Sequence, residues 1–299
     1  MTEVARGAYG ILLTTYDEDD RVSHRDLTAQ AEFVAGTCQG LVWPVLASEW
    51  YLMDADEIAA GYPAVAAGVG GRVPFVAGVT QLTTAGAVGL AQAAARAGAD
   101  AVIAMPPFLR KATGDDLVRH FQAIAAVGLP VVVQNAASMG AAGTLTAAEL
   151  RTLAESIPLV RHLKEEAPVL PQTISRALTA LPGLYERVFG GGGGRYLIDE
   201  LNRGGAGTMA ACEWVDVLGS VFRLYDEGRM DDARRLHTRA LAGIVLETAY
   251  GMAGAREVLR RRGVIHSTRT RFGAGAELDA DAHREIEAVL AHMPLEAVR

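Results

Sequence analysis

Short, continuously apolar runs alternate with amphipathic segments along the first two thirds of the chain. Runs that are apolar at successive positions indicate strands buried on both faces, as in a parallel sheet whose strands are joined by helices. Eight such runs are found at residues 9–15, 40–46, 73–79, 101–105, 130–135, 160–165, 187–190 and 207–211. This pattern predicts an α/β fold, a (β/α)8 TIM barrel, with a doubly wound open sheet as the alternative.

Segments with helical periodicity lie between these runs, at residues 27–37, 55–67, 84–97, 114–126, 147–155 and 170–181. Ser23, Asp54 and Thr146 are typical capping residues ahead of three of these helices. Strand signals stop after about residue 225, and residues 231–253, 255–262 and 282–291 favour further helices. We therefore expect a barrel domain over residues 1–225 and a C-terminal helical extension over residues 226–299.

Composition and charge exclude several classes of partner. A net charge of −7 with a pI near 5.5 argues against a nucleic-acid partner. No apolar run reaches about 18 residues and no signal-peptide pattern begins the chain, so we expect a cytoplasmic protein with no membrane partner. Cys38 and Cys212 are too few and too distant to predict a disulfide framework, and no Cys/His cluster has the spacing of a metal site.

Lysine is rare in this chain. Of 28 basic side chains only Lys111 and Lys164 are lysines, and Lys164 lies in the sixth predicted strand. Lysine, unlike arginine, can lose its proton and attack a carbonyl to form a Schiff base, and burial favours the neutral amine. The alternative is a structural lysine that reaches water at a strand end or pairs with Glu165 or Glu166.

In a (β/α)8 barrel, reactive residues project from the carboxyl ends of the strands and the loops that follow them. This rule selects Ser48, Glu49, Gln134, Asn135, Lys164, Glu166 and the glycine run 190–194. Because side chains alternate along a strand, His162, Lys164 and Glu166 share one face. Glu49 and Glu166 are candidates for moving protons on a substrate, and each is equally compatible with a carboxylate at the water-exposed rim.

The glycine run is neither a dinucleotide-binding fingerprint nor a P-loop. Its backbone amides are free of side chains and can approach an anionic or hydroxylated substrate closely. Gly190 and Gly191 are therefore candidate substrate contacts, with a merely flexible loop as the alternative.

With Lys164 on its sixth strand, the chain resembles the dihydrodipicolinate synthase and N-acetylneuraminate lyase family of class I Schiff-base enzymes. The resemblance rests on residues 7–15, 73–78, 98–107, the fifth strand, Lys164 with Glu165, and residues 204–208, and it includes the helical tail. It implies a Schiff base between Lys164 and a small 2-keto acid, a substrate contact near Thr14, a homotetramer and no cofactor.

Several positions depart from the synthases of that family. Residues 45–49 read Val-Leu-Ala-Ser-Glu where the family has a Gly-Thr-Thr-Gly-Glu loop. Gln134 replaces a proton-relaying tyrosine, Met139 replaces an arginine, and Phe108 with Leu109 replaces a tyrosine pair. An amide cannot act as a general acid or base at neutral pH, so a dihydrodipicolinate synthase is not expected.

Enzymes similar to L-2-keto-3-deoxyarabonate dehydratase fit better. They carry an apolar-Ser-Glu loop, a glutamine in place of the tyrosine and a glutamate two residues after the lysine, as residues 46–49, 133–135 and 164–166 do here. The resemblance implies dehydration of a 2-keto-3-deoxy sugar acid, with Glu49 or Glu166 as proton carrier. It places Ala47, Ser48 and Asn135 against the substrate. Gln81 stands where the subgroup has a histidine, so a pyruvate-releasing aldolase and a non-catalytic sugar-acid-binding barrel remain alternatives.

Overall fold

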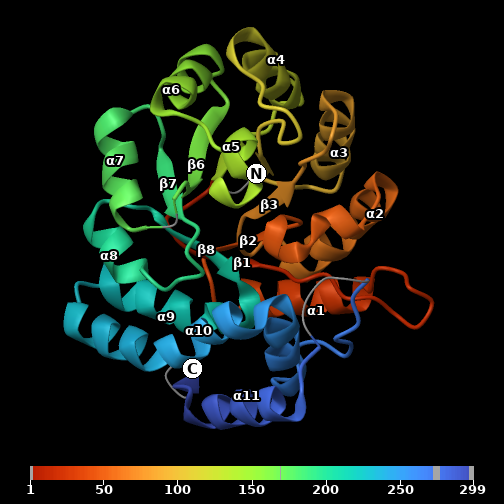
Figure 1. Cartoon of the computed structure of the whole chain (residues 1–299), viewed down its shortest axis with the longest axis vertical. Coiled ribbons are helices and arrows are strands. Elements are labelled where there is room, and N and C mark those ends of the chain that lie inside the picture. Colours follow the sequence, from red (N-terminus) through yellow and green to blue (C-terminus); the bar gives the residue numbers. More distant parts are fainter. Residues whose placement is uncertain (1–2, 169, 272–276, 296–299) are drawn as a thin grey trace.

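Eight parallel strands close into a barrel in sequence order (Figure 1). The computed structural model describes residues 3–168, 170–271 and 277–295. The strands are β1 (Gly7–Ile11), β2 (Gly40–Trp43), β3 (Phe75–Gly78), β4 (Ala101–Ala104), β5 (Val131–Ala136), β6 (Val160–Glu166), β7 (Arg187–Gly190) and β8 (Gly207–Ala211). The predicted (β/α)8 barrel is confirmed, and the open-sheet alternative is wrong.

Helices surround the strands in Figure 1. They are α1 (His24–Ala35), α2 (Ala55–Val69), α3 (Thr84–Arg96), α4 (Gly114–Ala125), α5 (Gly140–Gly143), α6 (Ala147–Ser156), α7 (Gln172–Ala180), α8 (Leu197–Asn202) and α9 (Val215–Asp226), with short 3-10 turns η1 (Leu46–Ser48), η2 (Trp50–Leu52), η3 (Ala137–Met139) and η4 (Cys212–Trp214). The predicted caps are confirmed: Ser23 accepts from a backbone N–H of α1, and Asp54 and Thr146 form capping boxes.

β1 and β2 end three or more residues earlier than their apolar runs predict. β1 ends at Ile11 because Gln30 of α1 takes over the next backbone groups: its amide accepts from Leu13 N at 2.8 Å and donates to Leu13 O at 2.9 Å. β2 ends at Trp43 because the following Pro44 has no N–H for the ladder. Both chain segments turn away at the carboxyl edge of the barrel.

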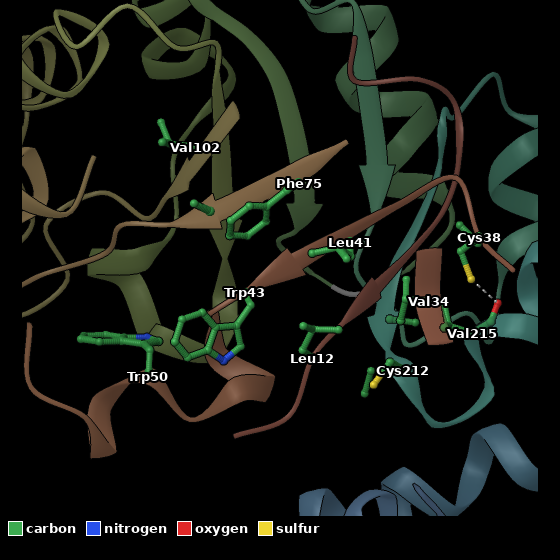
Figure 2. Packing of buried hydrophobic residues seen from close by; sticks show 14 of the residues in the cluster. Leu12, Val34, Cys38, Leu41, Trp43, Trp50, Phe75, Val102, Cys212 and Val215 are labelled. Carbon is green, nitrogen blue, oxygen red and sulfur yellow. Dashed lines mark hydrogen bonds between the residues drawn. The ribbon is translucent and has the colours of Figure 1, made fainter. Parts of the chain in front are cut away.

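Two apolar layers are separated by the sheet. The barrel interior is filled by alternate side chains of the strands, including Tyr9, Ile11, Val42, Val76, Ile103, Val132, Phe189 and Met209. Figure 2 shows part of the outer layer, where Leu12 and Leu41 lie between Trp43 and Val34. Cys38 and Cys212 are free thiols in this layer. The filled interior leaves the ends of the barrel as the places for a ligand.

The C-terminal helices α10 (Met230–Arg261) and α11 (Ala280–His292) lie on one side of the barrel, with α10 packed against α9 (Figure 1). The sequence predicts two helices divided near residue 254, and α10 is indeed interrupted by a kink at Gly251, three residues earlier, where φ is 56° and the backbone is not helical. The predicted boundary between the barrel domain and the helical extension, after residue 225, lies near the end of α9 and stays a prediction. Within the described residues, no helix has the length and apolar character that crossing a bilayer requires.

Asp26 of α1 connects the C-terminal segment to the barrel. Its side chain is 1% exposed and accepts hydrogen bonds from Thr15 Oγ1 at 2.9 Å and from the backbone N–H groups of His266 at 3.0 Å and Ser267 at 3.2 Å. Arg271 adds bonds from the same segment to Glu57 of α2. The C-terminal residues are therefore held over the carboxyl edge of β1 and β2.

Candidate active site

Lys164, Glu166 and Gln134 form one row on the inner faces of β5 and β6. The strand register places Gln134 beside Lys164. Lys164 Nζ lies 2.8 Å from Glu166 Oε1, and Gln134 Nε2 donates to Glu166 Oε2 at 2.9 Å. The side chains of Lys164 and Glu166 are 4% and 12% exposed. The structure therefore brings together three of the four predicted catalytic residues, and the predicted pairing of lysine with a neighbouring glutamate is also present.

The floor below Lys164 carries no formal charge at neutral pH. Phe189 of β7 is the register neighbour of Lys164 on the other side from Gln134. His162, two residues earlier on β6, is 3% exposed. Burial lowers the pKa of His162 to about 4, with Glu186 opposing the shift, so its imidazole is neutral at pH 7. Glu166 is thus the charged group that faces the Lys164 ammonium.

Glu49 belongs to a second polar group, between the loop after β2 and helix α10. Glu49 adopts a left-handed backbone conformation with φ 56°. Its Oε2 accepts from Arg256 Nη1 at 2.5 Å and from Thr270 Oγ1 at 3.4 Å, and both Glu49 and Arg256 are buried. A carboxyl group whose oxygen is engaged by a buried guanidinium is fixed in position, which suits a structural role better than that of a proton carrier.

The hydroxyls predicted to touch substrate fix the loop that carries Glu49. Ser48 Oγ donates to Leu12 O at 2.6 Å, and Thr14 Oγ1 donates to Ser48 O at 2.7 Å. Both side chains are fully buried. Ala47 packs at the edge of the inner core. Any substrate contact of this loop is therefore expected from its backbone and from Ala47 rather than from the two hydroxyls.

Asn135 faces away from the Lys164 row, because alternate residues of a strand point to opposite faces. Its Nδ2 donates to both carboxylate oxygens of Glu165 at 3.0 Å, and its Oδ1 accepts from Leu145 N at 2.7 Å. Burial raises the pKa of Glu165 to about 7, against the opposing effect of the Asn135 bond. The side chain of Asn135 does not join the candidate site. Instead it clamps β5 to β6 directly behind Lys164.

The glycine run leaves room for carboxyl groups on both faces of β7. A Cβ atom at Gly190 would lie 2.1 Å from Glu200 Oε1, outside the barrel. A Cβ atom at Gly191 would lie 2.1 Å from Glu166 Cγ. Any larger residue would displace one of these carboxyl groups, which is the physical reason for glycine here. Of the two predicted substrate contacts, Gly191 adjoins the Lys164 row and Gly190 faces outward.

Sequence reasoning missed Arg256, Glu213 and Glu247. Glu213 follows the end of β8 by two residues, so the strand-end rule could have selected it. Arg256 interrupts the buried face of α10 between Ala255 and Leu259, and a charge at such a position is a signal for a buried partner. Glu247 carries no sequence signal. Among the described residues, no group of His, Cys, Asp and Glu side chains has a geometry suited to a metal ion.

Glu200 gives the barrel a pH-dependent contribution to stability. It is 3% exposed, and its Oε2 has no hydrogen-bond partner within the described part of the chain. Burial raises the pKa of Glu200 to about 7, Asp199 adds to the shift, and Arg195 opposes it. Between about pH 4.5 and pH 7 the folded chain holds this proton more tightly than the unfolded chain, so the contribution falls as the pH rises.

We predict that Glu200→Gln, which keeps the side-chain shape and removes the titration, matches the wild type near pH 5. At pH 8 the variant should be more stable by about 3 kcal/mol, the equivalent of a shift of two to three pKa units. Urea unfolding at both pH values measures the difference. Glu257→Gln is the control of opposite sign: bonds from Arg260 and Arg261 lower the pKa of Glu257 to about 2, so this variant should be less stable at both pH values. A Glu200→Gln effect that does not change with pH would contradict the assignment.

Comparisons with known proteins agree with this geometry. A profile of the Dihydrodipicolinate synthetase family matches residues 5–293. A protein of Halobacterium salinarum, described as an uncharacterized DapA-like lyase, is 30% identical over 97% of this chain and 95% of its own length. The L-2-keto-3-deoxyarabonate dehydratase of Azospirillum brasilense is 26% identical over 95% of this chain and 93% of its own.

A solved structure extends the likeness to the whole barrel. It is a prophage protein of E. coli K12 that belongs to the dihydrodipicolinic acid synthase family and was crystallised in complex with pyruvate. It superposes with a TM-score of 0.87 over 97% of this chain and 98% of that one, at 21% identity. Because the family profile covers nearly the full length, the family resemblance is confirmed: the chain belongs to the dihydrodipicolinate synthetase family of lyases.

Proposed function

We propose that this chain dehydrates a 2-keto-3-deoxy sugar acid through a Schiff base on Lys164. The observation that carries the proposal is the buried row in which Glu166 contacts both the Lys164 amine and the Gln134 amide. The match to an L-2-keto-3-deoxyarabonate dehydratase, which covers 95% of this chain at 26% identity, supports this substrate class. The reaction needs no cofactor, because the lysine itself supplies the electron sink.

In the proposed reaction Glu166 Oε1 takes the ammonium proton of Lys164 across the 2.8 Å contact. The free amine attacks the C2 carbonyl, and the hydroxyl of the resulting carbinolamine leaves as water with the proton that Glu166 returns, which gives an iminium and restores the Glu166 carboxylate. Gln134 cannot exchange protons in this range, so its bond to Glu166 Oε2 serves to hold the carboxyl group in place and leaves Oε1 to act. The short distance makes Glu166 the better proton carrier of the two glutamates.

Dehydration then follows from the iminium. Glu166 removes a proton from C3, and the electron pair forms the C2–C3 double bond of an enamine. The enamine expels the C4 hydroxyl, which leaves as water with the proton that Glu166 returns, and a C3–C4 double bond forms. Hydrolysis of the iminium releases the unsaturated 2-keto acid and restores Lys164. The fixed Glu49–Arg256 pair holds the loop after β2, whose Ala47 and Ser48 line the substrate together with Gly191.

A homotetramer in the cytoplasm is part of the same proposal. Exposed apolar side chains follow three neighbouring strands: Tyr51 after β2, Leu82 after β3 and Leu109 after β4, which are 55%, 63% and 78% exposed. Such a patch favours burial against another copy of the chain. Sedimentation velocity tests it, and a monomer at micromolar concentration would contradict it.

We predict that borohydride reduction in the presence of pyruvate, or of a 2-keto-3-deoxy sugar acid, attaches the acid to the peptide that carries Lys164. Lys164→Ala and Lys164→Arg should abolish both the adduct and turnover, because neither side chain forms an iminium. Peptide mass analysis locates the adduct, and Lys111→Arg is the matched control that should retain it. A product that keeps all substrate carbons supports dehydration, whereas release of pyruvate would indicate an aldolase. If no 2-keto acid forms an adduct, the result favours the alternative of a non-catalytic binding barrel.

We predict opposite consequences for the two glutamates. Glu166→Gln should lower kcat by about 10²–10⁴-fold, the usual contribution of a positioned acid or base. Its loss of stability should be smaller than that of Glu49→Gln, because Lys164, unlike an arginine, can lose its charge when its partner is removed. Glu49→Gln should lower kcat less, and should reduce the free energy of unfolding by about 3–5 kcal/mol, because Arg256 loses a buried carboxylate. Steady-state kinetics and urea unfolding of both variants measure the two effects. The reverse pattern would make Glu49 the proton carrier.

A further inference from the structure

Glu213 and Glu247 are two carboxyl groups that the proposed reaction does not use. Glu213, in η4 after β8, is 3% exposed, and its Oε2 has no hydrogen-bond partner among the residues that the structure describes. Arg262 donates to the backbone oxygen of Glu213 and makes two bonds to Asp216, at 3.0 and 2.5 Å. The guanidinium next to Glu213 is therefore engaged by another carboxylate. A buried carboxyl oxygen without a partner indicates a missing ligand group.

Glu247 lies on α10 against the same glycine loop that touches Glu166. A Cβ atom at Gly193 would lie 2.9 Å from Glu247 Oε2, and one at Gly191 would lie 2.1 Å from Glu166 Cγ. The loop thus carries the proposed proton carrier near one end and Glu247 near the other. Arg195, on the next segment, donates to Thr248 Oγ1 at 2.7 Å. Glu166 and Glu247 therefore lie against the same glycine loop, two residues apart along it.

Glu213 and Glu247 lie on elements that contact each other. A Cβ atom at Gly243 of α10 would lie 2.9 Å from Trp214 Cε2, and Glu247 follows Gly243 by one turn on the same face of the helix. Burial raises the pKa of Glu213, and the neighbouring Glu247 raises it further. Burial also raises the pKa of Glu247, against the effects of Arg195 and Lys164, while Glu166 adds to the rise. Helix α10 packs on η4, which brings the two side chains to one side. Both shifts favour the protonated form of these two carboxyls.

We propose that Glu213 and Glu247 form the subsite for the hydroxylated end of the substrate and select a neutral end over one that carries a second carboxylate. This inference rests on the proposed function and names which part of the substrate these residues recognise. A protonated carboxyl donates one hydrogen bond and a carboxylate accepts others, which matches a hydroxyl group that both donates and accepts. The acid end of the substrate is bound elsewhere, near the Schiff base.

A second carboxylate would meet an unfavourable site. Lys164 faces Glu166, Arg256 faces Glu49 and Arg262 faces Asp216, so these cations already have carboxylate partners. Arg195 lies beside Glu247, donates to Thr248 Oγ1, and its charge already acts on the Glu247 carboxyl. A carboxylate beside Glu213 and Glu247 would add a like charge in a poorly solvated place, and like charges disfavour binding there. The discrimination therefore comes from an acidic subsite rather than from a missing basic one.

The test compares two six-carbon 2-keto-3-deoxy acids, one ending in CH2OH and one ending in a carboxylate. Calorimetry measures their Kd values with Lys164→Ala, which binds without turnover, and with the same variant carrying Glu247→Gln or Glu213→Gln. We expect the Lys164→Ala protein to bind the neutral-ended acid more tightly than the dicarboxylate. Glu247→Gln should weaken that binding by at least about tenfold, and should leave unchanged or improve binding of the dicarboxylate, because a charge is removed.

Glu200→Gln is the matched control, because Glu200 is a buried carboxyl behind β7, outside the barrel, and should leave both Kd values unchanged. Equal effects of Glu247→Gln on both acids, or no effect on either, would overturn the inference. Pyruvate trapping on otherwise wild-type protein separates the two claims, since pyruvate has no hydroxylated end. If the Glu247→Gln variant traps pyruvate as the wild type does, Glu247 acts in substrate recognition alone. Absent trapping in the wild type refutes the proposed function, independently of the calorimetric result.

Discussion

The contact between Lys164 and Glu166 is the interaction around which the rest of the site is arranged. Removing two charges from water costs several kcal/mol per ion, and a buried pair recovers this only when its remaining hydrogen-bonding groups are satisfied. Here Gln134 supplies the second bond to Glu166, and Gly191 leaves the space that the carboxyl occupies. A pair so placed stabilises the fold little compared with apolar residues of similar volume, so its presence is better explained by chemistry than by stability.

The outer face of the barrel fixes the geometry of the inner face. Asn135 and Glu165 join β5 to β6 one residue away from Gln134 and Lys164, and the register of the two strands follows from this clamp. The C-terminal extension has a similar part in the site, because α10 supplies the Arg256 partner of Glu49. The helical tail is therefore part of the candidate site as well as a neighbour of the barrel.

The sequence was informative where local pattern decides the outcome. Continuous apolar runs indicate all eight strands, and alternation along β6 correctly predicts that Lys164 and Glu166 share one face. Strand ends were less predictable, because Gln30 captures the backbone of Leu13 through a side-chain bond that no periodicity reports.

Contacts between distant segments could not be predicted from the sequence either, because individual side-chain bonds leave no periodic pattern in it. Arg256 and Glu49 are separated by 207 positions, and only the closed fold brings them together. Asn135 illustrates the opposite error. Its position at a strand end predicts a substrate contact. However, side chains alternate along β5, so Asn135 points to the opposite face from Gln134.

The near absence of lysine has a practical consequence for chemical labelling. The two side-chain amines of this chain differ sharply in accessibility: Lys111 is 35% exposed at a salt bridge to Glu149, whereas Lys164 is 4% exposed inside the barrel. An amine-reactive reagent applied to the folded protein therefore meets one open target and one enclosed target. The ratio of the two labels reports occupancy of the barrel mouth, with Lys111 as an internal reference in the same molecule.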